Sequence, residues 1–491
     1  MNIFLNKRAI VSFLFVLLAI GVIGQTKTEY FMRTSYMRTY LNPALTPDQG
    51  QLIIPVLPNI GANIQTNTIN LDHLTFKKNG ERVTFLHPSV SANEFLGDMK
   101  KDNYIRADVN YKIFALGLFI GKHYTNFDIG VRTQADINLP KSTFELLKVG
   151  FDQDNPTTYN LSNLSATASS FVEIGASQSR NFLNNSLAVG ARVKLLLGAG
   201  YIDLNAESLE IEAGPEKWRS LSKVTLRGAA PGVKPTYKED EIDESGMLKE
   251  GMLDGFDFGW KGIPGYGAGI DVGAVYDLSQ VLPVLSGLKV SAALNDIGFI
   301  YWTKKNAVEL MSPETAVEVT PNQYTHGNDG DNSLSNVLED AFNDLKQAVN
   351  LKSNPSGSKA RSTSLRMNMN LGAEYELLKN KLSVGALYSA RFGNYYTSHE
   401  FTVSGNYQPF SWLGTSLSCS AIHSAFDTFG FAMHLAPKKG MTFFVASDYV
   451  LPHVSTQFVP TSSKGLNLQV GFSVPIGKTA KARAKQDLDI E

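Results

Sequence analysis

Hydrophobic and polar residues alternate with a period of two along many segments of this chain. In FDIGVRTQADINL, residues 127–139, the odd positions are mainly apolar, and the even positions include Asp128, Arg132, Gln134 and Asp136. A period of two places these sets on opposite faces of a β-strand. The pattern predicts strands with one apolar and one polar face, but a single strand leaves open which face points inward.

The same alternation recurs along the chain and predicts an all-β protein with about fourteen strands. The predicted strands are 52–66, 103–121, 126–138, 164–179, 186–204, 265–278, 286–302, 362–378, 380–394, 398–408, 411–424, 427–436, 440–450 and 465–476. In the second of them the apolar phase slips near Phe114, which indicates a bulge or two shorter strands. An even strand number of this size is typical of single-chain outer-membrane barrels.

The connections between the strands differ in length according to the side of the sheet on which they fall. Four connections are long and fall on one side, namely 67–102, 139–163, 205–264 and 303–361. Those on the other side are short. Short periplasmic turns opposite long outer loops are typical of a transmembrane antiparallel barrel, whose apolar strand faces meet lipid and whose polar faces line the lumen. A soluble sandwich has no physical reason to sort its loops in this way, so the barrel is the preferred interpretation.

The N-terminus has the pattern of a secretory signal peptide. Lys7 and Arg8 precede an apolar run over residues 9–23, and cleavage after Gly24 would leave Gln25 as the first residue. The run is shorter than the about 20 residues that a membrane-spanning helix needs. We therefore expect an exported protein that enters the membrane with strands, because only helices and closed barrels satisfy their backbone groups in lipid.

Composition removes several classes of function. The net charge of -1 gives no electrostatic basis for nucleic acid binding. The single cysteine, Cys419, excludes an intramolecular disulfide and a multi-cysteine metal site. The sequence NDGDNS at 328–333 departs from a calcium loop at its sixth and twelfth positions, and no GxSxG elbow occurs. We expect no cofactor, no metal site and no enzymatic activity.

The polar faces of the predicted strands carry the candidate functional residues. The side chains expected to line the lumen are Arg106, Asp128, Arg132, Gln134, Asp136, Arg192, Lys194, Asp271, Arg366 and Glu374. Both signs of charge occur, so no ion preference follows. Two arrangements stay open, a polar network that fills and closes the barrel and a conducting lumen. The alternate glycines in 265–273, GYGAGIDVG, indicate a strand face from which bulk is excluded, as it would be against a plug inside the lumen.

A short motif near the N-terminus resembles a known family. TYLNPALTP at 39–47 is similar to the N-terminal Asn-Pro-Ala of the long-chain fatty-acid outer-membrane transporter family, and 186–198 and 265–278 add to the likeness. QVGFSVPI at 469–476 looks like the C-terminal assembly signal of outer-membrane barrels, although 478–491 follow it here. The mature chain is also similar to a Bacteroides-type barrel family of unknown function, which has shuttle and attachment proteins of a secretion system among its distant relatives.

The resemblance implies a fourteen-stranded barrel whose N-terminal segment plugs the lumen, with Asn42, Pro43 and Ala44 at the plug and ligand site. The expected organisation is a signal peptide, a plug segment, a barrel and a periplasmic tail, at 1–24, 25–51, 52–477 and 478–491.

Three functions follow as hypotheses for a protein of the outer membrane in contact with its lipid. The first is a transporter or channel for a small hydrophobic molecule, and it is preferred on the resemblance. The second is a non-transporting barrel that docks or scaffolds envelope or secretion-system proteins through the loops 205–264 and 303–361. The third is an outer-membrane lipid hydrolase, recognisable by a reactive serine.

Overall fold

The computed structural model describes residues 26–478 with internal gaps. The gaps are 58, 70, 79, 122, 151–155, 215, 239–240, 243–247, 250–252, 281–282, 320–342, 423–424, 438–439 and 451–464. The predicted signal peptide, the calcium-like stretch 328–333 and the tail beyond Lys478 lie outside the described residues. Within the described ranges no helix is both long and apolar enough to span a bilayer.

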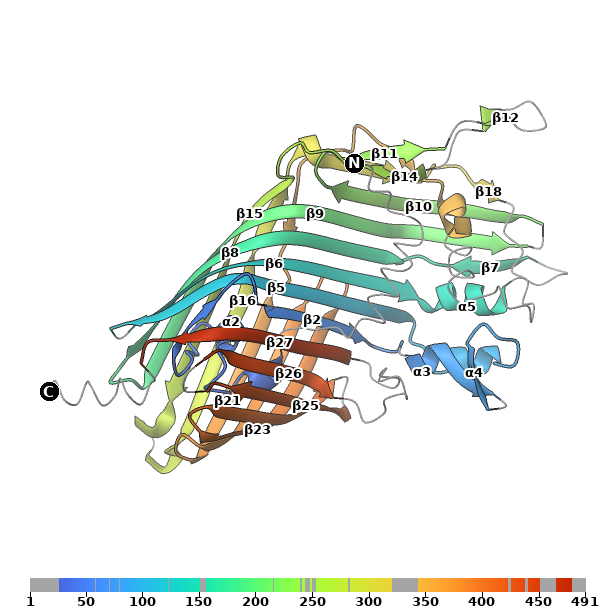
Figure 1. Ribbon diagram of the computed structural model, residues 1–491. Coiled ribbons are helices and arrows are strands. Elements are labelled where there is room, and N and C mark those ends of the chain that lie inside the picture. The colour runs from blue at the N-terminus through green and yellow to red at the C-terminus, as the bar shows by residue number, and fades with distance from the viewer. Residues whose placement is uncertain are drawn as a thin grey trace.

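The described strands form one closed antiparallel barrel with fourteen strand positions (Figure 1). Two positions hold interrupted strands, namely β1 (Gly50–Ile53) with β2 (Asn59–Thr66), and β20 (Arg361–Ser364) with β21 (Asn368–Leu378). The other twelve are β5 (Asp102–Ile120), β6 (His123–Pro140), β8 (Ser165–Phe182), β9 (Leu187–Ala213), β15 (Gly265–Asp277), β16 (Leu288–Trp302), β22 (Leu382–Phe392), β23 (Thr397–Phe410), β24 (Leu413–Ile422), β25 (Ala425–Leu435), β26 (Thr442–Val450) and β27 (Gly465–Ile476). Because β1 and β2 pair with both β27 and β5, the sheet closes on itself. The predicted all-β class and strand number are confirmed.

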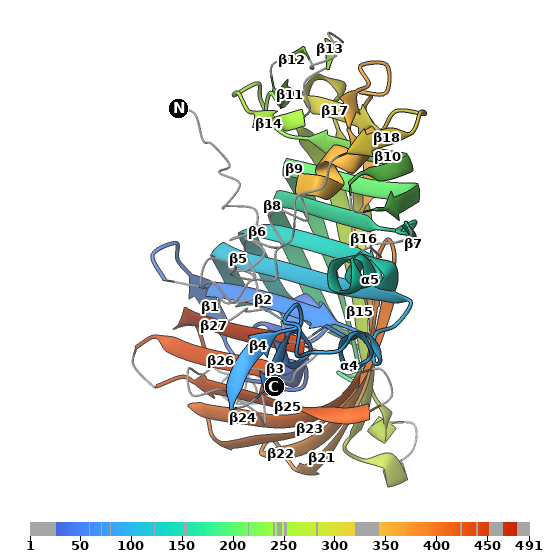
Figure 2. The same cartoon turned by 90° about the vertical axis from the view of Figure 1, so that its right-hand side faces the viewer.

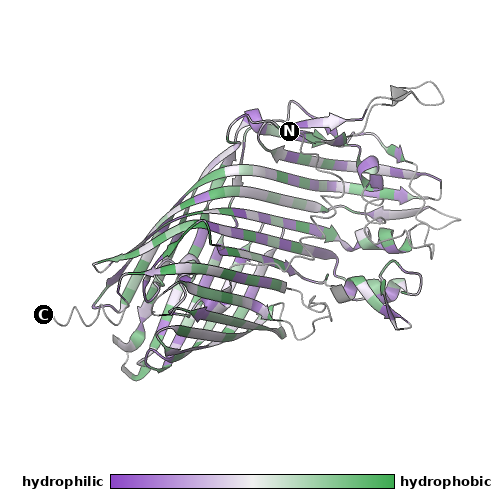
Figure 3. Cartoon of the chain, viewed as in Figure 1, coloured by the Kyte–Doolittle hydropathy of each residue, from purple (hydrophilic) through white to green (hydrophobic). Residues whose placement is uncertain are grey.

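Side chains alternate between the two faces of the barrel wall. On β9, Val193 and Leu195 point outward and are more than half exposed, whereas Arg192 and Lys194 point inward and are buried. Figure 3 shows the same alternation of hydrophilic and hydrophobic residues along the strands. An apolar outer face around a polar lumen suits a barrel in a bilayer.

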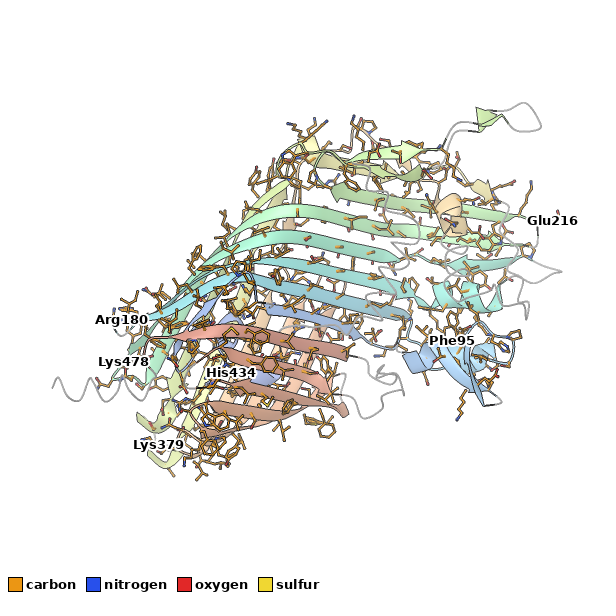
Figure 4. The ribbon with its side chains drawn as sticks, in the orientation of Figure 1. Phe95, Arg180, Glu216, Lys379, His434 and Lys478 are labelled. Carbon is orange, nitrogen blue, oxygen red and sulfur yellow. The ribbon has the colours of Figure 1, made fainter. Side chains whose placement is uncertain are left out.

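The two ends of the barrel differ in their connections. At one end, called the turn end here, the connections between strands are short, and Arg180, Lys379 and Lys478 lie there (Figure 4). Phe95 and Glu216 lie at the opposite end, called the loop end here. Every long connection of the predicted topology starts and finishes at the loop end.

Four neighbouring strands, β5, β6, β8 and β9, extend past the other barrel strands at the loop end (Figure 1). There the last part of β9 pairs with β10 (Trp218–Ala229), which pairs in turn with β17 (Ala307–Met311) and β18 (Val317–Val319) (Figure 2). The segment 205–264, expected to be a loop, therefore begins with two paired strands, which corrects the predicted end of the strand 186–204. The physical reason is continued alternation, since inward-facing residues such as Leu209 bury against an apolar cluster.

The connection between β2 and β5 folds into a small module on the loop end. It contains α3 (Leu71–Leu74), β3 (Thr75–Lys78), β4 (Glu81–Thr84) and α4 (Ala92–Leu96). Phe85 and Phe95 stack in its own apolar core, which also takes in Phe144 of α5 (Lys141–Val149). The remaining short elements are β7 (Thr157–Asn160), β11 (Lys234–Tyr237), β12 (Glu241–Ile242), β13 (Leu248–Lys249), β14 (Leu253–Asp257), β19 (Lys352–Ser353), η2 (Leu278–Gln280), η3 (Pro283–Leu285) and η4 (Lys304–Asn306).

Two predicted strands are interrupted in the structure. The strand expected at 52–66 breaks after Ile53, where Pro55 lacks the backbone N–H that a ladder needs. The strand expected at 362–378 breaks at 365–367. The irregularity predicted near Phe114 is confirmed, because the register between β5 and β6 shifts at that point.

Candidate functional site

The chain from Thr26 to Gln49, called the luminal segment here, lies inside the barrel. It contains η1 (Lys27–Glu29) and α2 (Arg38–Leu41), all of whose residues are buried. Its hydrogen bonds reach different parts of the wall. Thr28 Oγ1 donates to Asp448 of β26 (2.7 Å), while Leu41 O accepts from the Asn295 amide of β16 (2.8 Å). The segment therefore spans the lumen.

The start of the luminal segment is attached to β23, β26 and β27. The backbone N–H groups of Lys27 and Thr28 donate to the two carboxylate oxygens of Asp448, at 2.9 and 2.8 Å. The ammonium of Lys27 is paired with Glu400, which also accepts a hydrogen bond from the Tyr449 hydroxyl (2.9 Å). Charge-assisted bonds of this kind are stronger than neutral ones, so this part of the segment is firmly held.

Asn42, Pro43 and Ala44 lie in the lumen against β9, β15 and β16. The Asn42 side chain accepts from the Ala44 N–H (2.9 Å) and donates to the Tyr30 hydroxyl (3.0 Å). The first bond closes a turn of the kind that Asn favours. A second set of bonds ties this region to the wall, because Leu41 O also accepts from Asn370 of β21 (2.9 Å).

Two wall glycines make room for the Asn-Pro turn. A Cβ on Gly273 of β15 would lie 2.0 Å from Asn42 Oδ1, and a Cβ on Gly190 of β9 would lie 2.2 Å from the Pro43 carbonyl carbon. Neither glycine has a backbone conformation that requires glycine, so close approach is the physical reason for both. Within the predicted glycine-rich stretch 265–273, Gly273 is the member that faces the luminal segment.

Eight charged side chains form a continuous network across six adjacent strands of the wall, called the charged belt here. Its members are Lys112 of β5, Asp128 and Arg132 of β6, Glu173 of β8, Arg192 and Lys194 of β9, Asp271 of β15 and Asp296 of β16. Charges of opposite sign alternate along it. Arg192 Nη2 lies 2.7 Å from both Asp128 Oδ1 and Glu173 Oε1. Burial of these charges is tolerable because each is paired.

The luminal segment touches the charged belt through Tyr40. The Lys112 ammonium nitrogen lies 4.2 Å from the centroid of the Tyr40 ring. The central carbon of the Arg192 guanidinium lies 5.1 Å from the same centroid. A cation is attracted to the face of an aromatic ring, and the attraction grows when both are desolvated. Tyr40 therefore links the position of the luminal segment to the charges of the wall.

A second cluster of ion pairs joins β5 and β6 to Arg366, which lies in the break between β20 and β21, and a hydrogen bond links it to β23. Arg106 Nε bonds to Asp136 Oδ1 (2.8 Å), and Arg106 Nη1 donates to Ser398 Oγ (2.9 Å). Arg366 Nη1 reaches the same Asp136 oxygen at 3.2 Å and pairs with Asp108 as well. With the charged belt, this cluster surrounds the space that the luminal segment leaves open.

That space is a cavity of about 70 Å³ between the luminal segment and the two ion-pair clusters. Met37, Tyr40 and Leu41 of the luminal segment border it, together with Asn110 of β5 and Gln134 of β6. It is large enough for several water molecules or for one compact polar group. Among the described residues no group of three or more His, Cys, Asp or Glu is placed to hold a metal ion.

The structure brings most of the residues predicted to line the lumen into these clusters. Those in the charged belt are Asp128, Arg132, Arg192, Lys194 and Asp271, and those in the second cluster are Arg106, Asp136 and Arg366. Gln134 borders the cavity. Glu374 lies apart from both clusters and accepts a hydrogen bond from Ser383 (2.7 Å).

Sequence reasoning missed several charges of the lumen. Asp296 sits at a register shift that reverses the alternation, so a strict period of two assigns it to the wrong face. Lys112 precedes the register shift of its strand and has the same alternate position as Arg106, so it could have been found. Lys27 belongs to the luminal segment, where no strand pattern applies. Glu173 could also have been found, because it alternates with the apolar Val172 and Ile174 in a predicted strand.

The binding of the luminal segment to its place inside the barrel, called its seating here, depends on pH because the segment contains a buried acid. The carboxylate of Glu29 accepts hydrogen bonds from Thr26 Oγ1 (2.5 Å) and Ser35 Oγ (2.9 Å) and is 1% exposed. Burial raises the pKa of Glu29 from 4.5 to about 7, although the two hydroxyls lower it in part. The seated segment thus holds a proton that a released segment loses above its ordinary pKa.

We predict that the luminal segment is seated more firmly at pH 5 than at pH 8. The stabilisation is lost as pH rises from about 4.5 to about 7, by an amount on the order of 3 kcal/mol. Limited proteolysis of the segment at both pH values checks this, with Glu29→Gln as the comparison. Equal pH dependence in the wild type and in Glu29→Gln would contradict it, since the variant carries no titrating group at that position.

Comparison with solved structures finds several proteins that are similar to this chain. Solved structures similar to this chain include the toluene transporter TbuX of Ralstonia pickettii, with 10% identity, a TM-score of 0.41 and coverage of 94% of this chain and 100% of that one. A deltaS2S3 mutant of the monoaromatic hydrocarbon channel TodX has 10% identity, a TM-score of 0.45 and coverage of 94% and 98%. A FadL homologue of Pseudomonas aeruginosa has 10% identity, a TM-score of 0.37 and coverage of 92% and 98%.

A search of the curated proteins finds no match. The sequence model of one family covers residues 43–448, which is most of the chain and nearly the whole barrel. The predicted membership of a barrel family without an assigned function is thereby confirmed. The chain belongs to the family of unknown function DUF5723.

Proposed function

We propose that this protein is an outer-membrane channel or transporter for a small hydrophobic molecule, and that its luminal segment closes the lumen. One observation carries the proposal. Residues 26–49 lie inside the barrel, bonded to several parts of the wall, and border a cavity of about 70 Å³. A lumen closed in this way passes a solute only when the segment moves.

The outer face of the barrel supports a place in the outer membrane. Large apolar side chains are exposed there, among them Val193, Phe299 and Leu417, and an exposed apolar surface of this extent is costly in water. In this proposal the turn end lies in the periplasm and the loop end faces outward. The signal peptide predicted at 1–24 supports this location, because an outer-membrane protein must be exported.

An apolar cluster on the lumen side supports a hydrophobic cargo. Phe171, Leu196, Ile300 and Trp302 pack together toward the loop end of the lumen. The Arg132 guanidinium lies 5.5 Å from the centroid of the Phe171 ring, so the cluster directly adjoins the charged belt. A hydrophobic molecule arriving from the loop end would meet this cluster before it reaches the cavity.

The proposal is tested by what the protein retains after mild detergent extraction. We expect mass spectrometry to find a small hydrophobic molecule with the full chain, and to lose it when residues 30–47 are deleted. Deletion of the distant hairpin 241–249 is the matched control and should leave the bound molecule in place. The assignment of a hydrophobic cargo to the lumen would be contradicted if the full chain carried no such molecule. It would also be contradicted if the molecule stayed bound after deletion of residues 30–47.

A second candidate, a docking barrel, is favoured by the folded loop end. Residues 205–213 and β10 form a sheet whose buried side carries Leu209, Ile211 and Trp218, and such a sheet offers a rigid surface to another protein. A protein partner that co-purifies with the full chain and is lost on trimming the hairpin 206–227 would favour this candidate. Co-purification unchanged by trimming would exclude the sheet as its site.

A further inference from the structure

The charges that border the luminal cavity are unequal in number. Among the described residues around it, eight are lysine or arginine and four are acidic, namely Asp108, Glu173, Asp271 and Asp296. Asp128, Asp136, Glu400 and Asp448 pair with or lie near several of these cations but are not among the bordering residues. A molecule in the cavity therefore has more cations than carboxylates at short range, and Coulomb energy falls with distance.

The acids and the cations that border the cavity also differ in how many of their hydrogen-bonding groups are already used. The bordering acids are all engaged. Asp108 pairs with Arg366, Asp296 with Arg132 and Asp271 with Lys194. Glu173 accepts from both Arg132 and Arg192, at 2.8 and 2.7 Å. A cation entering the cavity would have to compete with bonds that these carboxylates already make.

The cations, by contrast, keep unused donors. The Arg391 guanidinium of β22 makes no hydrogen bond to any other residue that the structure describes, and its nearest ion-pair partner, Asp108, is 4.0 Å away. The Nε atoms of Arg132 and Arg192 are buried without a partner in the described part of the chain. A guanidinium has five donors in a planar fork that matches the oxygens of a carboxylate or phosphate.

We infer that the luminal cavity is a binding site for an anionic oxygen group, a carboxylate or a phosphate, and that Arg391 is its specificity-determining residue. The inference names a chemical class of ligand for the lumen of the proposed function. Binding to the cavity is measured on the closed full chain, so it is tested whether or not the luminal segment ever opens. A failure here would leave the proposed closure standing, and a failure of the closure would leave this site standing.

Arg391 is suited to a mutational test because the fold depends little on it. The acids near it keep other partners, since Asp108 remains paired with Arg366 and Glu400 with Lys27. Arg391→Gln removes the charge at similar size, and Arg391→Lys keeps the charge but loses the planar fork. Lys379→Gln is the matched control, because Lys379 lies exposed in the turn between β21 and β22, at the turn end (Figure 4).

The experiment is isothermal titration calorimetry on the detergent-purified full chain with inorganic phosphate, benzoate and neutral benzyl alcohol. We expect phosphate or benzoate to bind more tightly than benzyl alcohol. Arg391→Gln should weaken that binding about tenfold or more, as the loss of a charged hydrogen bond does, while Arg391→Lys weakens it less. Lys379→Gln should bind as the wild type does.

The outcomes separate the two sources of an anionic group. Phosphate binding identifies a site for small free oxyanions, and benzoate binding without phosphate identifies a site for the acidic group of a hydrophobic molecule. The inference is overturned if neither anion binds, if benzyl alcohol binds as tightly as benzoate, or if Arg391→Gln binds unchanged. Heat-dependent gel mobility of each variant confirms that the barrel is folded.

Discussion

Replacing both Gly190 and Gly273 by valine is expected to unseat the luminal segment while the barrel stays folded. The new Cβ atoms would lie 2.2 Å from the Pro43 carbonyl carbon and 2.0 Å from Asn42 Oδ1, far inside contact distance. Overpacking of this kind costs about 1–3 kcal/mol at each site. If the two costs add, seating weakens by roughly 30-fold or more. Valine itself suits a strand, so the wall has no reason to unfold.

The measurement is the rate at which an added protease cleaves the luminal segment of the purified protein. Gly405→Val is the matched control, because Gly405 lies within a strand of the same barrel and a Cβ there has no atom within 4 Å. We expect rapid cleavage in the double variant and wild-type protection in the control. If the double variant were protected from the protease as well as the wild type is, these two glycines would not determine how firmly the luminal segment is bound in the barrel.

The second large effect is expected from Arg192→Met, which removes the cation at the centre of the charged belt. Asp128 and Glu173 would each lose a bond of 2.7 Å in a buried site, and the Tyr40 ring would lose a cation beneath it. Removal of one partner from a buried ion pair costs about 3–5 kcal/mol. The lower end of that range applies here, because Lys112 and Arg132 still neutralise the two acids in part.

Arg180→Met is the matched control for this prediction. Arg180 lies at the turn end of β8, exposed, beside the Phe182 ring (Figure 4). The urea concentration at which the heat-dependent mobility of the folded barrel is lost reports the difference in stability. We expect a clear fall for Arg192→Met and almost none for Arg180→Met. Equal midpoints would mean that the charged belt adds little to the stability of the wall.

The period-two alternation, together with the sorting of long and short connections, predicts the barrel and the orientation of its wall. Phe127 and Asp128 illustrate this, since the first is exposed on the outer face and the second is fully buried in the lumen. Such a local pattern fails where the register shifts. Asp296 has a left-handed backbone conformation at a bulge in β16, and this aims its carboxylate at Arg132 of β6, 164 residues away.

The candidate site was predictable in its composition but not in its pairing. The alternation of apolar and polar residues predicts which charged residues lie on the polar face of each strand. The choice between a closed polar network and an open lumen depends on which of these charges form ion pairs with one another. Arg132 pairs with Glu173 and Asp296, neither of which local spacing connects to it. The glycines are similar. Gly273 can be recognised in the sequence as a position without a side chain on a strand face. Its spatial neighbour Asn42, however, comes from a distant part of the sequence.

The central claim is that the luminal segment closes the barrel, and conductance in planar lipid bilayers tests it most directly. The full chain is compared with a chain that lacks residues 26–49, and heat-dependent mobility establishes that both barrels are folded. We predict that the full chain is mostly non-conducting and that the shortened chain conducts steadily. A folded shortened chain that conducts no better than the full chain would contradict the account.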